Sequence, residues 1–160
     1  MSLRNTVLGL GLALFATAAA AQDRPAYGPE VTLEKAKQMA AGAVEESKKN
    51  GWRMAIAIVD NHGFLIYFER MADTQTASVQ VALDKATAAA MYRRPTKAFQ
   101  DGVAGGGAGL RLLTLRGASA VEGGLPIMIN GKVSGAIGVS GANADEDSKA
   151  AVAGLKAAGL

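Results

Sequence analysis

Two pairs of short apolar runs, each pair separated by a polar turn, give the strongest pattern in the chain. In the second pair, residues 125–129 and 132–140 flank an Asn-Gly dipeptide, which favours a tight type I′ turn because both turn residues need a positive φ angle. In the first pair, residues 54–59 and 64–70 flank a turn that contains Asp, Asn, His and Gly. Each pair therefore predicts an antiparallel β-hairpin.

Three other segments carry small residues, mainly alanine, at helical spacing. They predict helices over residues 33–49 and 74–92, and a last helix that ends near residue 158. The last helix is expected to begin at Asn143, since Glu146 three residues later completes a capping-box pattern. The resulting order is helix, hairpin, helix, irregular segment, hairpin and helix. This order predicts an α+β fold with an antiparallel sheet flanked by helices, not a doubly wound parallel sheet.

The irregular segment, residues 97–124, is predicted to contain loop and a short helix. Its Gly-rich run, residues 102–109, lacks the Gly-Lys-Ser/Thr ending of a phosphate-binding loop and does not lead from a clear strand into a clear helix. We therefore expect a mobile loop over a pocket rather than a nucleotide site.

The first 21 residues have the parts of a secretory signal peptide: Arg4, an apolar stretch over residues 7–16, and a final run of alanines. The apolar stretch is too short to span a bilayer, which argues against the alternative of a membrane-anchored N-terminus. Cleavage is predicted after Ala21, followed by a flexible leader over residues 22–31 and one domain over residues 32–160. The protein is thus expected to be periplasmic or secreted, with no membrane span after cleavage.

The amino-acid composition narrows the chemistry that the chain can perform. The 17 Lys and Arg residues only slightly outnumber the 14 Asp and Glu residues and are dispersed, which argues against a nucleic-acid partner. The absence of cysteine excludes disulfides, a thiol nucleophile, thiolate-bound zinc and iron–sulfur sites. His62 is the only imidazole, so it is either an exposed turn residue or a metal ligand, such as an iron ligand supplied at a subunit interface.

Candidate ligand-binding side chains occur first around the start of the second predicted helix. Arg70 and Met71 end the preceding strand, where the guanidinium either holds an acidic ligand or closes a structural ion pair. Ser78 and Lys85 share one face of the helix. A buried Lys85 would act as an anion anchor or as an amine of lowered pKa, whereas a lysine at the helix edge would extend into solvent.

A second candidate region leads from the last strand into the last helix. Ser140 and Gly141 lie where backbone N–H groups and the positive end of a helix dipole favour an anionic ligand. Acidic residues of the first helical turn, Asp147 among them, compete for the same donors. Asp147 is also a candidate to join Lys85 as a polar group in a pocket.

Six motifs over residues 32–160 together resemble the GlcG/HbpS-like family of haem-degrading or haem-binding domains. They are 57–63 (AIVDNHG), 69–71 (ERM), Ser78 with Lys85, Ala86 and Ala89, 94–96 (RPT), 123–127 (GGLPI), and 135–141 (GAIGVSG) with Glu146 and Asp147. Each motif is loose alone, but six in this order are specific. The position of His62 commonly holds a small residue in the family, so the resemblance does not supply a histidine ligand.

The resemblance implies a profilin- or PAS-like sandwich whose antiparallel sheet has five strands, with the fifth near residues 118–122. It also implies homo-oligomers. Members of the family are associated with haem binding, in some cases with haem degradation, and with extracellular sensing beside a sensor kinase.

Three functions are then open. The first is an exported, oligomeric binding protein for haem or a similar planar, anionic small molecule, with Arg70 or Lys85 toward the carboxylates and with haem degradation or sensing as an accessory role. The second is an enzyme that acts on a small organic acid through Lys85 and Asp147, although the sequence spacing fixes no acid–base pair. The third is a purely structural or sensory subunit, which needs neither site.

Overall fold

Two β-hairpins alternate with helices in the computed structural model, which describes residues 24–160. The elements are α1 (Leu33–Lys49), β1 (Ala55–Asp60), β2 (Leu65–Arg70), α2 (Ser78–Tyr92), α3 (Lys97–Ala104), the 3₁₀ helix η1 (Gly107–Thr114), β3 (Gly124–Ile129), β4 (Lys132–Ser140) and α4 (Ala144–Ala157). The predicted signal peptide lies outside the described residues. Within residues 24–160, no helix is both long and apolar enough to cross a membrane.

The two hairpins form one antiparallel sheet in the strand order β2-β1-β4-β3. β1 and β4 pair in the middle, from Ala55 opposite Ser140 to Asp60 opposite Gly135. The predicted α+β class, with helices flanking an antiparallel sheet, is confirmed. The expected number of strands was wrong, because the sheet of the described chain has four strands rather than five.

The expected fifth strand at residues 118–122 is an irregular segment. The backbone N–H of Ala118 closes a turn on the carbonyl of Leu115 (3.1 Å). The backbone N–H of Glu122 donates to the side-chain oxygen Oε1 of Gln100 in α3 (2.8 Å). These donors are satisfied by a local turn and by a side chain, so they do not form a ladder with β3.

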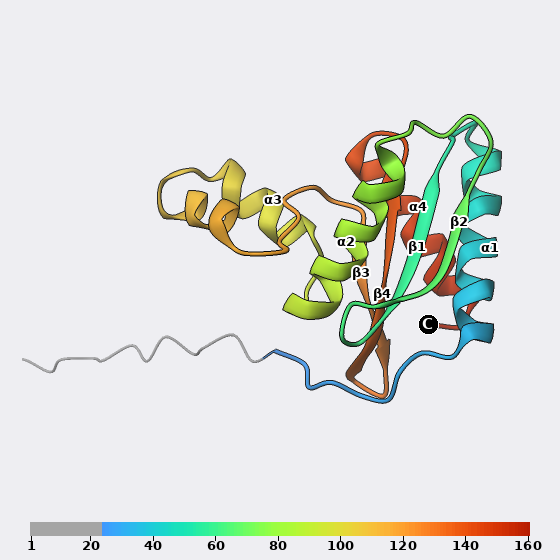
Figure 1. Cartoon of the computed structure of the whole chain (residues 1–160), viewed down its shortest axis with the longest axis horizontal. Coiled ribbons are helices and arrows are strands. Elements are labelled where there is room, and N and C mark those ends of the chain that lie inside the picture. Colours follow the sequence, from blue (N-terminus) through green and yellow to red (C-terminus); the bar gives the residue numbers. More distant parts are fainter. Residues whose placement is uncertain (1–23) are drawn as a thin grey trace, which may run out of the picture.

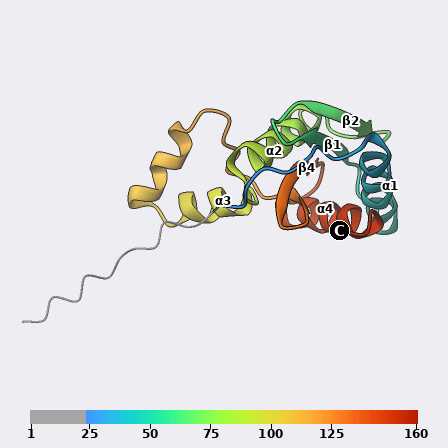
Figure 2. The same ribbon diagram turned by 90° about the horizontal axis from the view of Figure 1, so that it is seen from below.

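Helices cover both faces of the sheet (Figures 1 and 2). α1 and α4 pack together on one face, and α2 packs against β1 and β4 on the other. Side chains of β1 alternate accordingly: Ile56 and Ile58 join the core beneath α1 and α4, whereas Ala55, Ala57 and Val59 face α2. Because both faces are buried, the strand is a continuous apolar run even though its neighbours are antiparallel.

The helix α2 approaches the backbone of β4 closely at Gly138. A Cβ atom at this position would overlap the carbonyl oxygen of Ala82 and would lie 2.9 Å from the Cβ of Ala86. Only glycine leaves room for the helix here. The contact holds the middle of α2 against the sheet, and Lys85 is the residue before Ala86.

The segment formed by α3 and η1 projects from the rest of the molecule (Figures 1 and 2). Its Gly-rich part, residues 102–109, ends α3 and begins η1, where the sequence predicts loop and a short helix. Two of its leucines, Leu110 and Leu113, are more than half exposed. The role of this segment as a mobile loop over a pocket stays a prediction.

Candidate functional site

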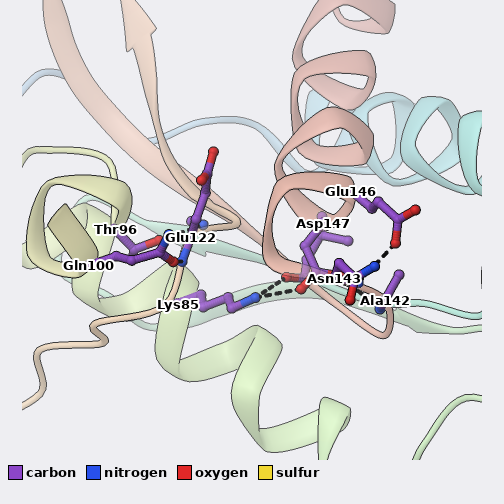
Figure 3. Close-up of polar contacts among 10 residues, drawn as sticks. Lys85, Thr96, Gln100, Glu122, Ala142, Asn143, Glu146 and Asp147 are labelled. Atoms are coloured by element: carbon purple, nitrogen blue, oxygen red, sulfur yellow. Dashed lines mark hydrogen bonds and ion pairs between the residues drawn. The ribbon is translucent and has the colours of Figure 1, made fainter. Parts of the chain in front are cut away.

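A buried ion pair joins α2 to α4 (Figure 3). The Nζ of Lys85 lies 2.7 Å from Oδ2 of Asp147, and the two side chains are only 1% and 3% exposed. Lys85 also donates to the carbonyl oxygen of Val139 in β4 (3.1 Å). The other carboxylate oxygen, Oδ1 of Asp147, accepts from the backbone N–H of Ala142 (3.0 Å). The pair therefore ties two helices and the end of a central strand together.

Local sequence features place Asp147 toward this pair. Asn143 and Glu146 form the predicted capping box, in which the N–H of Asn143 donates to Oε2 of Glu146 (3.0 Å). The capping box fixes the first turn of α4, and Asp147 follows it on the inner face. Burial raises the pKa of Asp147, while the ion pair with Lys85 and backbone N–H donors act in the opposite direction.

The space around this ion pair is filled by protein. A Cβ atom at Gly123 would lie 2.8 Å from Nζ of Lys85 and 2.9 Å from the Cβ of Asp147. Neither charge is open to solvent in this structure, so the pair gives no support to an enzyme that uses Lys85 and Asp147 on an organic acid. A ligand-binding role for the two residues stays a prediction.

The other predicted ligand residues lie at one end of the sheet. Arg70 in β2 and Ser140 in β4 both lie opposite Ala55 of β1, and Gly141 follows Ser140. Ser78 is buried at the start of α2, whereas Arg70 is exposed. The structure thus brings Lys85 and Asp147 together and leaves Arg70 two strands away from Ser140.

Met71 lies in a different environment from its predicted partners. Its sulfur accepts a hydrogen bond from the backbone N–H of Met54 (3.5 Å), and its side chain packs against the core. It also lines a surface hollow of about 420 Å³ that carries charges of both signs, including Arg53 and Glu69. The mixed charge gives this hollow no clear preference for an anionic ligand.

An apolar hollow of about 380 Å³ lies between the leader, the end of α2, β3 and α4. We call it the apolar hollow, and its lining residues are Pro25, Arg93, Arg94, Pro95, Leu125, Pro126, Met128 and Leu155. Two arginines therefore line this hollow, together with prolines, leucines and a methionine, and its exposed lining is almost entirely apolar. This combination suits a flat apolar ligand that carries negative groups.

The two arginines of the apolar hollow are held by aromatic rings. The guanidinium of Arg94 lies 4.1 Å from the ring centre of Phe99, and that of Arg93 lies 5.2 Å from the ring centre of Tyr27. Arg93 also donates to the carbonyl oxygen of Pro25 (3.1 Å). Burial lowers the pKa of Arg94, and its buried Nε has no hydrogen-bond partner among the described residues. Arg94 thus retains an unused donor.

Reasoning from residue chemistry alone did not single out Arg93 and Arg94 as candidate site residues. The available signal was the Arg94-Pro95-Thr96 motif that follows a helix end. Thr96 is buried, donates its N–H to the carbonyl of Gly124 (3.0 Å) and accepts the N–H of Gly124 at Oγ1 (2.9 Å). These two bonds hold the end of α2 beside β3 and so place Arg94 at the hollow.

His62 is an exposed residue of the turn between β1 and β2. This agrees with the first of the two alternatives given for it, an exposed turn residue, and leaves the second, a metal ligand, as a prediction. It also lies close to two carboxylates, those of Glu30 and Asp60. The ring of Tyr27 is stacked on its imidazole with centres 6.4 Å apart. His62 does not belong to the apolar hollow.

This chain is similar to known proteins in both sequence and fold. Residues 31–156 match the family model described as Haem degrading protein HbpS-like. Protein GlcG of Escherichia coli (strain K12) is 33% identical over 110 residues, which cover 69% of this chain and 81% of GlcG.

Two solved structures extend the comparison. A double mutant of HbpS from Streptomyces reticuli is 27% identical, with a TM-score of 0.74 and 97% of each chain covered. The PduOC protein, solved in complex with haem, is 25% identical, with a TM-score of 0.73 over 80% of this chain and 94% of PduOC. The predicted resemblance is therefore confirmed, and the chain belongs to the HbpS-like family.

Proposed function

We propose that this protein binds haem, or a similarly planar and anionic small molecule, in the apolar hollow. The observation that carries the proposal is the pair Arg93 and Arg94 beside a surface of prolines, leucines and Met128. Haem has the complementary surface, because its ring faces are apolar and its two carboxylates lie on one edge. The haem complex of PduOC supports the same class of ligand.

In this proposal the residues of the hollow have three different roles. Leu125 and Leu155 contact the ring face, and the two guanidinium groups pair with the carboxylates. Met128 is 37% exposed, and its thioether is a known type of haem-iron ligand. The arginines replace Arg70 and Lys85 as carboxylate partners, since Lys85 is already paired with Asp147.

Replacing Met128 with glutamate should weaken haem binding at least about tenfold. The new carboxylate remains solvated in the free protein because residue 128 is partly exposed, but bound haem would cover it and bring negative groups together. Titration of the purified protein with hemin, followed by the Soret band, measures the affinity.

Val121→Glu is the matched control for this titration. Val121 is 44% exposed, also apolar, and lies outside the apolar hollow, so its substitution should leave the affinity unchanged. Equal affinities for the two variants would remove the hollow as the site. Absence of a Soret change in the unaltered protein at micromolar hemin would remove haem itself as the ligand.

We also propose that the protein is exported, self-associates, and acts in haem degradation or in sensing with a sensor-kinase partner. Export rests on the signal-peptide pattern of the first 21 residues. Self-association is supported by the projecting α3–η1 segment, whose exposed leucines would be covered by a second copy. N-terminal sequencing of the mature protein and its mass in solution test these two statements.

A further inference from the structure

Three side chains of metal-binding type converge at a surface site that shares no residue with the lining of the apolar hollow. Glu30 comes from the leader, Asp60 from the end of β1, and His62 from the following turn. One ligand atom of each residue lies within 4.8 Å of the others. We call this group the His62 cluster.

Contacts outside the cluster hold each of its members in place. Backbone bonds from Gly28 to Val133 (2.9 Å) and from Val31 to Ser134 (2.8 Å) fix the leader on both sides of Glu30. The ring of Tyr27 lies nearly parallel to the imidazole, at an interplanar angle of 12°. The cluster is therefore assembled before any ligand arrives.

The carboxylate of Asp60 is oriented by the turn. Its Oδ1 accepts the backbone N–H groups of His62 (2.8 Å) and Phe64 (2.9 Å). Oδ2 has no hydrogen bond from the residues that the structure describes, so it retains its capacity to bind a cation.

Neither carboxylate of the His62 cluster is paired with a cation among the described residues, although Lys132 lines a surface hollow together with Glu30. No Lys or Arg within residues 24–160 forms an ion pair with Glu30 or Asp60, although the two carboxylates lie close together. Asn61, between Asp60 and His62, is 6% exposed. Its Nδ2 donates to the carbonyl of Gly28 (2.6 Å), while its Oδ1 has no partner among the described residues. A bound cation would offset the repulsion between the carboxylates.

We propose that the His62 cluster binds a divalent first-row transition metal ion such as Zn²⁺. One imidazole nitrogen with two carboxylate oxygens is a donor set that suits zinc and its neighbours better than Mg²⁺, which prefers oxygen ligands alone. Three protein ligands leave a coordination position for water or for a further ligand. This site is distinct from the apolar hollow and does not rest on haem binding.

The single histidine permits a direct test by proton NMR on the full-length protein prepared without a polyhistidine tag. Addition of Zn²⁺ should shift the imidazole proton signals of His62 and saturate, whereas Mg²⁺ at the same concentration should not. Glu30→Gln should weaken the zinc affinity, measured by calorimetry, at least about tenfold, because it removes a charged ligand but keeps the side-chain shape.

Glu34→Gln is the matched control, since Glu34 is also exposed and lies outside the cluster. Its zinc affinity should equal that of the unaltered protein, and His62→Ala should lose binding. An unshifted imidazole at about 1 mM Zn²⁺, or equal affinities for the Glu30→Gln and Glu34→Gln variants, would overturn the proposal. Circular dichroism establishes that each variant is folded before its affinity is compared.

Discussion

Replacing Lys85 with methionine is expected to lower the free energy of unfolding by about 3–5 kcal/mol, because it leaves the buried Asp147 carboxylate without its cation. Methionine has a similarly unbranched, flexible side chain, so the loss of unfolding free energy comes mainly from the missing charge and hydrogen bonds and not from a cavity. Urea denaturation followed by far-UV circular dichroism measures the change.

Lys97→Met is a matched control for the Lys85 substitution. Lys97 and Asp101 are also 2.7 Å apart, but their side chains are 51% and 59% exposed, so solvent can replace the lost partner and little stability should change. The double variant Lys85→Met/Asp147→Leu should recover much of the loss by removing the unpaired charge. An equally small effect of Lys85→Met and Lys97→Met would contradict a stabilising role for the buried pair.

The pH dependence of the Lys85→Met variant follows from the raised pKa of Asp147. Lys85 lowers this pKa and so opposes the effect of burial; its removal should therefore leave the pKa of Asp147 still further above its ordinary value. An acid with a higher pKa in the folded state binds its proton more tightly when the protein is folded. The free energy of unfolding therefore falls as the pH rises from the unfolded-state pKa of Asp147 to its folded-state pKa. The difference in unfolding free energy between Lys85→Met and the double variant should therefore become smaller as the pH is lowered from about 8 to about 5.

Gly138→Ala is expected to destabilise the protein by about 3 kcal/mol, because the added methyl group would collide with the backbone of α2. The collision involves the carbonyl oxygen of Ala82, which cannot move aside as a flexible side-chain end could. The helix must shift from the sheet, and the ion pair of Lys85 shifts with it. Thermal and urea unfolding measure the loss.

Gly105→Ala separates this steric effect from the general effect of replacing glycine. Gly105 has an ordinary φ of −69°, and the nearest atoms to an added Cβ would be 3.5 Å away. Its substitution should change stability by no more than about 0.5 kcal/mol. A Gly138→Ala variant as stable as Gly105→Ala would show that α2 and β4 are less tightly packed than the structure indicates.

Local patterns were enough to predict the hairpins and most helices. The predicted run 132–140 coincides with β4, and the Asn-Gly dipeptide forms its turn. α2 begins four residues later than predicted, since Oγ1 of Thr74 instead donates to carbonyl oxygens of the distant Met54 and of Met71. The prediction of a fifth strand was not based on such a pattern; it followed from the family resemblance alone.

The candidate sites depend on contacts between distant parts of the chain, which a local pattern does not contain. Helical spacing identified the face of Lys85, but its partner Asp147 is 62 residues away. Glu30 lies in a segment whose Pro and Gly content predicts flexibility, and only the bonds of that segment to β4 place it beside His62. Arg94 is likewise positioned by Thr96 through its bonds to Gly124.

The leader contributes to both proposed sites. It supplies Pro25 to the apolar hollow and Glu30 to the His62 cluster, and Tyr27 between them contacts Arg93 as well as His62. Because backbone hydrogen bonds to β4 hold this segment in place, a change that detached it from β4 should weaken both proposed sites together. Thermodynamic linkage makes any coupling between the two sites reciprocal: a metal ion that raises the affinity for haem has its own affinity raised by haem, by the same factor.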